Sequence, residues 1–259
     1  MKVVLLAGGF GTRICEESQY KPKPMLDIGG MPIIWHIMKS YSHFGYNDFI
    51  ICGGYKQEYI KKWFSNYFLR KSDVTFDFTD GDEQVIIHKS EVEPWRVTIV
   101  DTGLNTMTGG RIKRVAHYIG NNTFMMTYGD AVCDVDINEL LAFHKTNKKL
   151  ATLTAVKLSE SKGVLDIDEA NSVKSFREKN RQQDAYINAG FMVLEPEIFN
   201  LIDGDSTNFE VDVLPRLVSM NELASFKHSG YWQCMDTMRE KVLLEKLYNE
   251  KTAPWVFDD

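Results

Sequence analysis

The sequence lacks the features that define several protein classes. None of its apolar runs approaches the roughly 20 residues that a membrane-spanning helix needs, so we expect no membrane partner. Its four cysteines, Cys15, Cys52, Cys133 and Cys234, are far apart and form no CxxC pair. This spacing argues against a disulfide or zinc framework and favours free thiols in a reducing compartment, so we expect a cytoplasmic protein.

The sequence also lacks an excess of basic residues. Lysine and arginine number 30 against 36 acidic residues, which gives a net charge of −6. A nucleic-acid partner is therefore not expected. The six histidines show no metal-ligand spacing. The chain starts on an apolar run that resembles a core strand, which leaves no room for a signal peptide.

The most informative stretch of the chain lies near its start. Residues 3–7 form an unbroken apolar run, which is typical of a buried strand in a parallel sheet. Glycines 8, 9 and 11 follow, and glycine lets a backbone approach a ligand closely. Thr12 and Arg13 close the turn, and Lys23 comes ten residues later. A strand, a glycine turn, a hydroxyl group and cations together indicate a phosphate-binding site.

This glycine turn does not match the common phosphate loops. No Gly-Lys-[Ser/Thr] closes it, so it is not a Walker A loop. Ile14 stands where a dinucleotide fingerprint has its third glycine, which argues against a nicotinamide oxidoreductase. A phosphate loop with Arg13 and Lys23 added suits a reaction in which charge builds on transferring and departing phosphates.

The apolar pattern predicts an α/β fold of Rossmann type. Short apolar runs alternate with amphipathic stretches, as expected for a mixed, mostly parallel sheet flanked by helices. Residues 71–101 break this alternation and predict a hairpin inserted at the sheet edge, followed by a strand. The other predicted strands cover residues 48–52, 124–128, 151–157, 163–168, 173–178, 186–194 and 224–228. The predicted helices cover residues 32–44, 58–68, 111–118, 137–144, 209–220 and 237–249. Within residues 58–68, the predicted apolar face consists of Ile60, Trp63, Phe64, Tyr67 and Phe68. The aromatic stripe of Tyr59, Trp63 and Tyr67 is also predicted to face the core.

Two aspartates occupy the ends of predicted elements. Asp130 follows the strand at 124–128, and Asp236 immediately precedes a helix whose first residues, Thr237 and Glu240, form a capping box. Ligands in open α/β sheets bind at the carboxyl ends of strands, and Mg²⁺ prefers one or two carboxylates plus substrate phosphates. The pair therefore fits a magnesium site if the fold brings them together. The alternative is that each is a turn or cap residue.

Several motifs together resemble the sugar-phosphate nucleotidylyltransferase family. The first is Leu-Ala-Gly-Gly-Phe-Gly-Thr-Arg at residues 6–13 with Lys-Pro-Met at 23–25. Further matching pieces lie at residues 101–103, 107–111, 127–130 and 232–237, so the likeness runs almost from end to end. The first motif alone indicates the family, and the whole set favours its cytidylyl branch.

The resemblance implies Mg²⁺-dependent transfer of a cytidylyl group from CTP to a sugar 1-phosphate, glucose 1-phosphate or another phosphorylated acceptor, with release of pyrophosphate. The pattern along the chain shows no linker and predicts a single domain of residues 1–259, with a nucleotide-binding core to about 157 and an acceptor-binding part from about 158. Arg13 and Lys23 would be catalytic. The nucleotide would contact Leu6, Ala7, Gly8, Gly9, Gly11, Thr12, Arg13, Lys23, Thr106, Arg111 and Gly129, the metal would contact Asp130 and Asp236, and the acceptor would contact Glu178, Lys179 and Asn188.

The sequence departs from the family pattern on the acceptor side. Where the family has Glu-Lys-Pro and glycine, residues 178–181 are Glu-Lys-Asn-Arg; where it has Phe-Gly-Ala-Leu-Asp, residues 162–166 are Lys-Gly-Val-Leu-Asp. Cys234 replaces a proline in the Trp-Gln-Pro-Met-Asp segment. Our hypothesis is that the acceptor differs from glucose 1-phosphate and is another phosphorylated sugar or a non-sugar phosphate.

Two alternatives to cytidylyl transfer stay open. UTP or dTTP would be the donor if a few loop contacts differ, or the chain would be a non-catalytic nucleotide-sugar sensor on the same fold. Retention of Arg13, Lys23, Asp130 and Asp236 argues against a sensor, since a binder does not need all four. We also expect a homo-oligomer, with the aromatic-rich hairpin and the helix at 59–68 as candidate contact surfaces.

Overall fold

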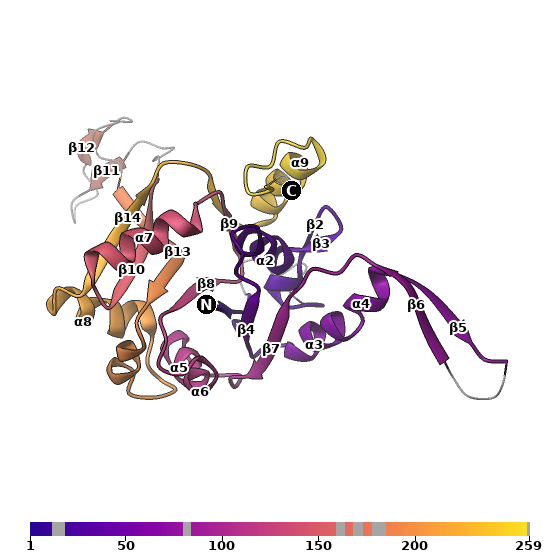
Figure 1. Cartoon of the computed structure of the whole chain (residues 1–259). Coiled ribbons are helices and arrows are strands. Elements are labelled where there is room, and N and C mark those ends of the chain that lie inside the picture. The colour runs from indigo at the N-terminus through magenta and orange to yellow at the C-terminus, as the bar shows by residue number, and fades with distance from the viewer. Residues whose placement is uncertain (12–18, 80–83, 159–163, 168–172, 178–184, 258–259) are drawn as a thin grey trace.

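A seven-stranded sheet forms the centre of the molecule, in the order β14-β10-β13-β8-β1-β4-β7 (Figure 1). The computed structural model describes residues 1–11, 19–79, 84–158, 164–167, 173–177 and 185–257. Among the described strands of this sheet, β13 alone runs against its neighbours; the other pairings are parallel. The predicted mixed, mostly parallel sheet is therefore confirmed. Its strands are β1 (Lys2–Leu6), β4 (Asp48–Gly53), β7 (Arg96–Asp101), β8 (Phe124–Tyr128), β10 (Ala151–Leu158), β13 (Ala185–Leu194) and β14 (Leu223–His228).

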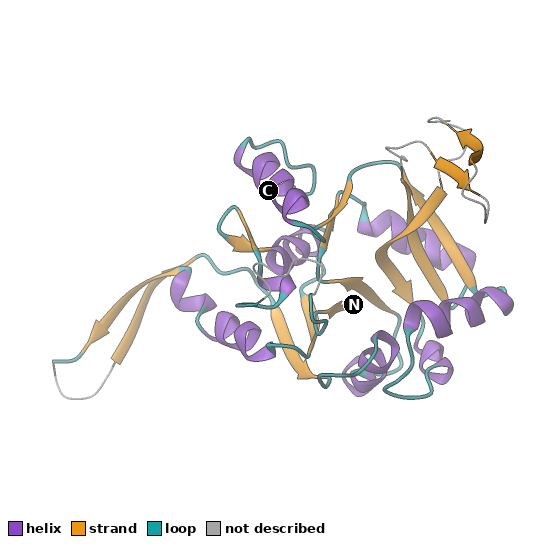
Figure 2. Cartoon of the chain, turned by 180° about the vertical axis from the view of Figure 1, so that it is seen from behind, coloured by secondary structure: helices purple, strands orange, loops and turns teal. Residues whose placement is uncertain are grey.

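Helices cover both faces of the sheet, and each face has its own apolar core (Figure 2). The central position of β1 explains why its sequence is apolar from Val3 onward: Val3 and Leu5 enter one core, and Val4 and Leu6 enter the other. A strand buried on both faces has no polar side to expose. The first core contains residues of α2 (Ile33–His43), α3 (Gln57–Ser65), α7 (Ile137–Asn147) and α9 (Met238–Asn249); the second contains residues of α5 (Thr108–Arg114), α6 (Ala116–Ile119), η4 (Pro196–Leu201), η5 (Phe209–Val213) and α8 (Leu214–Ser219).

Three predicted helices are interrupted. Residues 58–68 divide at Asn66 into α3 and α4 (Tyr67–Arg70), and residues 111–118 divide at Val115 and begin earlier, at Thr108. The helix at 209–220 opens with the π-helical turn η5 and becomes α-helical at α8. Pro215 has no N–H to donate to residue 211, which gives a physical reason for the wider turn ahead of it.

The predicted orientation is wrong for two aromatic residues of α3 and α4. Tyr67 is buried and Trp63 packs partly against the first core, as the helical spacing predicts. Tyr59 is instead 42% exposed. Ile60 is buried, as predicted, whereas Phe68, which was also predicted on the apolar face, is 44% exposed.

The predicted hairpin exists but does not join the main sheet. β5 (Ser72–Asp77) and β6 (Gln84–Ser90) pair antiparallel with each other and form a separate two-stranded sheet. They extend from the end of α4 away from the body of the molecule (Figure 1). Smaller pairs join β2 (Asp27–Ile28) to β3 (Met31–Pro32), β9 (Ala131–Cys133) to β15 (Trp232–Cys234), and β11 (Val164–Ile167) to β12 (Val173–Arg177).

The predicted division at about residue 157 coincides with the end of β10. Strands before and after that point belong to the same sheet, because β13 pairs with β8 and with β10. The assignment of the two parts to nucleotide and acceptor stays a prediction. Among the helices described, none is both long and apolar enough to cross a membrane.

The buried imidazole of His36 makes stability depend on pH. Its side chain lies in α2, 2% exposed, and its Nε2 donates to the carbonyl oxygen of Ile28 at 2.8 Å. Burial lowers the pKa of His36 to about 4, against 6.5 for an unperturbed histidine. The unfolded chain therefore binds a proton in a range where the folded chain does not.

We expect stability to be full above about pH 6.5 and to fall as the pH drops from there towards about 4, by roughly 3 kcal/mol from this group. Thermal unfolding of wild type and His36→Asn across pH 4–7 measures this slope, and it should be shallower in the variant. His43→Asn, at an exposed position of the same helix, is the control that should retain the wild-type slope. Equal slopes in all three proteins would contradict the assignment.

Candidate functional site

A cavity of about 710 Å³ lies at the carboxyl ends of β1 and β8. Its walls come from the glycine turn after β1, from η2 (Lys23–Met25), from the loop before α5, and from β13 and β15. All the predicted site residues that the structure describes line this cavity. They are Leu6, Ala7, Gly8, Gly9, Gly11, Lys23, Thr106, Arg111, Gly129, Asp130, Asn188 and Asp236.

The other predicted site residues lie outside the described residues. These are Thr12 and Arg13 of the glycine turn and Glu178 and Lys179 of the acceptor motif. Residues 162–163 and 178–181, where the sequence departs from the family pattern, lie there as well. The structure thus brings the predicted nucleotide and metal residues into one cavity, and their individual roles stay predictions.

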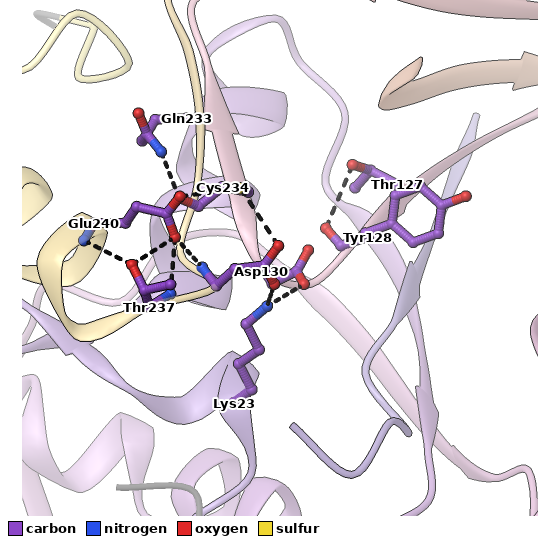
Figure 3. A network of polar contacts seen from close by, with 9 residues as sticks. Lys23, Thr127, Tyr128, Asp130, Gln233, Cys234, Thr237 and Glu240 are labelled. Atoms are coloured by element: carbon purple, nitrogen blue, oxygen red, sulfur yellow. Dashed lines mark hydrogen bonds and ion pairs between the residues drawn. The ribbon is translucent and has the colours of Figure 1, made fainter. Parts of the chain in front are cut away.

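Lys23 joins the two predicted metal ligands (Figure 3). Its Nζ lies 2.6 Å from Oδ2 of Asp130 and 2.5 Å from Oδ1 of Asp236. The side chain of Lys23 is 9% exposed, whereas the two carboxylates are 32% and 22% exposed. Residues that are more than 100 positions apart in the sequence therefore meet at a single ammonium group.

Opposing effects act on the pKa of Lys23. Burial is the largest single effect and lowers it, but the charges and hydrogen bonds of Asp130 and then Asp236 outweigh burial and raise it above 10.5. The ammonium is therefore charged at any physiological pH. The stabilisation that this raised pKa represents is present below about pH 10.5 and is lost as the pH rises through the folded pKa of Lys23.

The carboxylate of Asp236 is not the cap of α9. Thr237 is the N-cap residue, and its hydroxyl accepts from the N–H of Glu240 while Glu240 accepts in return from the N–H of Thr237 (Figure 3). The predicted capping box is thus confirmed. It leaves the Asp236 carboxylate directed at Lys23, which removes the capping alternative for this residue.

The donors gathered here suit a hard divalent cation. The two carboxylates already converge on one positive charge, and oxygen donors of this kind are what Mg²⁺ prefers. Cys234 lies nearby, with Sγ 3.7 Å from Oδ2 of Asp236. Burial and then the charges of Glu240 and Asp236 raise the pKa of Cys234 to about 11, so its thiol stays protonated and is a poor ligand.

The side chain of Arg111 packs against Gly8 and bonds the chain at the ends of β4 and β7. Its guanidinium is buried and donates to the carbonyl oxygens of Gly53, Gly103 and Leu104 and to the hydroxyl of Thr102, at 2.7 to 3.2 Å. Burial lowers its pKa from 12.5. Among the residues described, no carboxylate forms an ion pair with it. A buried cation with only neutral acceptors leaves positive potential beside the cavity, which favours anionic ligands.

The packing of Arg111 explains one glycine of the turn and predicts a contrast with the next. A Cβ on Gly8 would lie 2.1 Å from Nη1 of Arg111, whereas a Cβ on Gly9 would meet nothing within 4 Å among the residues described. Gly8→Ala should therefore displace Arg111 and cost about 1–3 kcal/mol of stability. Gly9→Ala should unfold at the wild-type temperature.

Differential scanning calorimetry with steady-state kinetics separates the two glycine roles. If the main chain at Gly9 approaches the donor phosphates, Gly9→Ala will raise the KM for the nucleotide while the unfolding temperature stays unchanged. Gly8→Ala will lower both stability and activity. Equal unfolding temperatures for the two variants would contradict the packing argument.

Sequence analysis missed one carboxylate of the cavity wall. Glu210, in η5, accepts from the hydroxyl groups of Tyr128 and, at 2.6 Å, Thr108. These two donors hold the carboxylate in place, and burial followed by the charge of Glu210 raises the pKa of Tyr128. A fixed acceptor of this kind suits recognition of ligand hydroxyl groups. No local signal marks Glu210, since its neighbours in sequence read only as a helix.

A second group with metal-ligand chemistry has a structural explanation. Cys133, Asp134 and His228 place possible ligand atoms within 4.8 Å of one another. Asp134 Oδ1 is already engaged by the imidazole of His228 at 2.7 Å and by the N–H of Tyr231 at 2.7 Å. These bonds connect the residue after β9 to the end of β14 and to the turn that follows it, so Asp134 fixes this turn.

Comparison with known proteins agrees with the geometry. Residues 2–240 match the sequence pattern of the nucleotidyl transferase family. The chain is 53% identical to the glucose-1-phosphate cytidylyltransferase of Salmonella typhi over 256 residues, which is 98% of each chain. It is 38% identical to the probable glucose-1-phosphate cytidylyltransferase of Bacillus subtilis, covering 98% of this chain and 99% of the other.

Solved structures confirm the fold. The crystal structure of HddC from Yersinia pseudotuberculosis complexed with GMP-PN superposes with a TM-score of 0.68 at 26% identity, over 95% of this chain and 99% of that one. A putative glucose-1-phosphate thymidylyltransferase from Bacillus anthracis gives a TM-score of 0.67 at 17% identity, over 100% and 98% of the two chains, which supports the fold alone.

Proposed function

Because the chain belongs to the nucleotidyl transferase family, we propose that it transfers the cytidylyl group of CTP to a sugar 1-phosphate and releases pyrophosphate. The observation that carries the proposal is the convergence of Lys23, Asp130 and Asp236 beside the glycine turn, in a cavity large enough for a nucleotide. The whole-length relatives named glucose-1-phosphate cytidylyltransferase support CTP as the donor.

The proposed reaction is an in-line displacement at the α-phosphorus. An oxygen of the acceptor phosphate forms the new bond, and the bond to the β-phosphate oxygen breaks, so that pyrophosphate leaves with the electron pair. The acceptor phosphate has a second pKa near 6 and is ionised at pH 7, so no general base is needed. Catalysis then consists of positioning and of neutralising phosphate charge.

The described residues divide this work between them. The main chain of Gly8, Gly9 and Gly11 holds the nucleotide phosphates, and the guanidinium of Arg111 packs against Gly8. Lys23 neutralises the α-phosphate, for which its ammonium must turn from the carboxylates towards the cavity. By the resemblance, Arg13 holds the β- and γ-phosphates of the departing pyrophosphate.

A divalent cation is part of the proposal, and the family generally uses one; we propose Mg²⁺. Asp130 and Asp236 would hold it, since their carboxylates converge and both line the cavity. When bound, it supplies positive charge that the phosphates share during displacement. With the cation bound, the carboxylates no longer need the ammonium of Lys23 as their counter-ion.

Glucose 1-phosphate is the first acceptor to test, because two close relatives carry that name. Asn188 and Glu210 line the cavity near β13 and η5 and offer acceptors for sugar hydroxyl groups. The changed motifs at residues 162–166 and 178–181 keep the alternative of another phosphorylated acceptor in the proposal.

The test is a pyrophosphate-release screen of CTP, UTP, dTTP and GTP against a panel of phosphorylated acceptors with Mg²⁺. We expect release to be fastest with CTP and a sugar 1-phosphate. Efficient turnover of glucose 1-phosphate would refute the hypothesis of a different acceptor, and preference for UTP or dTTP would replace CTP as donor. No release with any pair would favour the non-catalytic sensor.

Two further expectations accompany this function. We propose that the protein works in the cytoplasm, where the nucleotide and sugar phosphates are made; the described cysteines Cys52, Cys133 and Cys234 are free thiols. We also propose that the protein forms a homo-oligomer.

A further inference from the structure

Two lysines approach one tyrosine ring on the main sheet. The Nζ of Lys157, in β10, lies 5.8 Å from the ring centroid of Tyr186, in β13, and the Nζ of Lys227, in β14, lies 5.2 Å from the same centroid. All three side chains are exposed. We call these three residues the lysine–tyrosine cluster. Because β14, β10 and β13 are neighbours in the sheet (Figure 1), hydrogen-bonded strands hold the cluster in place.

Strand register places the cluster beside the cavity. Ala155 pairs with Asn188 on one side and with Lys227 on the other, so these three residues form a row across the sheet and share one face. Lys157 and Tyr186 pair with each other two residues further along their strands, which keeps them on that face. Asn188 lines the cavity and belongs to the predicted acceptor residues. The cluster therefore continues the acceptor side of the cavity wall.

The row between Asn188 and Lys227 is short and carries no large side chain. Adjacent strands lie about 4.8 Å apart, so the two backbones are separated by about 10 Å. Ala155 stands between them and has only a methyl group, so no long side chain of β10 divides the row. A small acceptor that contacts Asn188 with one end therefore directs its other end towards the cluster.

The two ammonium groups of the cluster favour an anion. Each is attracted to the face of the Tyr186 ring, but like charges that approach the same ring repel each other. Lys227 forms no ion pair among the residues described. The whole chain has a net charge of −6, so this positive cluster does not reflect a generally basic surface. An anionic group between the two lysines would replace their repulsion by attraction to both.

The sequence adds positive charge on the acceptor side as well. Where the acceptor motifs depart from the family pattern, Lys162 stands in place of a phenylalanine and Arg181 in place of a glycine. Lys162 follows Lys157 by five positions, and Arg181 precedes Tyr186 by five. Both residues lie outside the described residues and enter here by their charge alone. Each departure exchanges an uncharged residue for a cation, which favours an acceptor with more negative charge.

We propose that the lysine–tyrosine cluster binds a second anionic group of the phosphorylated acceptor, either a phosphate or a carboxylate. The acceptor is then a small molecule with an acid group at the end remote from its reacting phosphate, a group that glucose 1-phosphate lacks. Lys157 and Lys227 pair with the anion, and the hydroxyl of Tyr186 is available to donate to it. This acceptor class rests on the proposed cytidylyl transfer, and it narrows that proposal to one kind of substrate.

Matched acceptors test the second anion. Pyrophosphate release is measured with CTP and Mg²⁺ for glucose 1-phosphate against glucuronic acid 1-phosphate and glucose 1,6-bisphosphate, and for phosphoethanolamine against phosphoserine. We expect the acceptor with the extra carboxylate or phosphate to have at least tenfold higher kcat/KM in at least one comparison, which also identifies the anion. Release that is as efficient without the extra anion in both comparisons would overturn the acceptor class and leave cytidylyl transfer standing. Absence of release with every acceptor would overturn both.

Variants of the two lysines test the site itself. Lys157→Met with Lys227→Met should raise the KM for the preferred doubly charged acceptor at least tenfold, while kcat and the KM for CTP stay within twofold of wild type, because the anion lies away from the reacting atoms. Its singly charged counterpart should keep its KM. Lys157→Arg with Lys227→Arg should retain the low KM, and so should Lys246→Met, at an exposed lysine of α9. An unchanged KM in the double methionine variant, or equal losses with both acceptors, would overturn the site.

The arginine variant also excludes a merely structural role. If the lysines only support the fold, both double variants will lose activity with every acceptor alike and will unfold at lower temperature. If they bind the anion, the unfolding temperatures will stay close to that of wild type and only the methionine variant will lose the preference for the second charge. Loss of this preference in the arginine variant at an unchanged unfolding temperature would also count against the site.

Discussion

Replacing Asp130 by alanine is expected to abolish pyrophosphate release, with kcat reduced about 10³-fold or more. The substitution removes one of two carboxylates that would hold the divalent cation and one of the two ion-pair partners of Lys23. The remaining carboxylate of Asp236 would then pair with Lys23 alone, and the ammonium would be held away from the donor phosphate. Initial rates of pyrophosphate release with saturating CTP measure the effect.

A control variant and a metal-binding measurement make the Asp130 result specific. Asp203→Ala removes a carboxylate that pairs with Arg216 at 2.9 Å on the surface, and its rate should equal that of wild type. Titration with Mn²⁺, followed by the loss of the free-ion electron paramagnetic resonance signal, should show weaker binding to the Asp130→Ala variant. Near-normal activity of this variant would return Asp130 to the turn residue that its position after β8 also allows.

Replacing Lys23 by methionine is expected to reduce both activity and stability. A side chain of similar length then fills the space but leaves Asp130 and Asp236 facing each other without a counter-ion. Breaking a buried ion pair costs about 3–5 kcal/mol, and we expect the lower end because both carboxylates are partly exposed. Activity should fall about 10²–10³-fold through loss of charge at the α-phosphate.

The metal dependence of unfolding separates the two roles of Lys23. Because the ammonium and a divalent cation would contact the same carboxylates, Mg²⁺ should raise the unfolding temperature of Lys23→Met more than that of wild type. Lys21→Met is the matched control. The ammonium of Lys21 lies 2.5 Å from the carboxylate of Asp27, and it does not pair with Asp130 or Asp236. Equal stabilisation of Lys23→Met and wild type by Mg²⁺ would contradict a shared set of oxygen atoms.

The opening motif could be interpreted from the sequence because its information is local. An apolar run of five residues, three glycines and Arg13 lie within residues 3–13, and Lys23 follows ten residues later, so spacing alone indicates a buried strand and a phosphate turn. The structure confirms the strand in β1 and places Gly8, Gly9, Gly11 and Lys23 on one cavity. The capping box at Thr237 was predictable for the same reason, since both its members lie within one helical turn.

The orientation of individual side chains was less accessible. Helical spacing predicted both Tyr59 and Ile60 on the inward side of α3, yet only Ile60 is buried and Tyr59 is exposed. Side chains at neighbouring positions of an amphipathic helix point in directions that differ by only a fraction of a turn around the helix axis. Packing therefore decides which of them is buried. The break at Asn66 was hidden for a similar reason, because the apolar pattern continues through it.

The sequence by itself determined the fold class and the glycine turn after the first strand, and its resemblance to a known family pointed to twelve residues that line the cavity. Only the tertiary structure decided which of these residues meet. Three elements meet at one edge of the sheet: η2, the end of β8 and the start of α9. This meeting brings Lys23 to Asp130 and Asp236, and no spacing in the sequence encodes it. The same holds for Glu210, which reaches Tyr128 only through packing. Local patterns follow from short-range sterics and burial, whereas the site follows from long-range contacts that the whole core must fix.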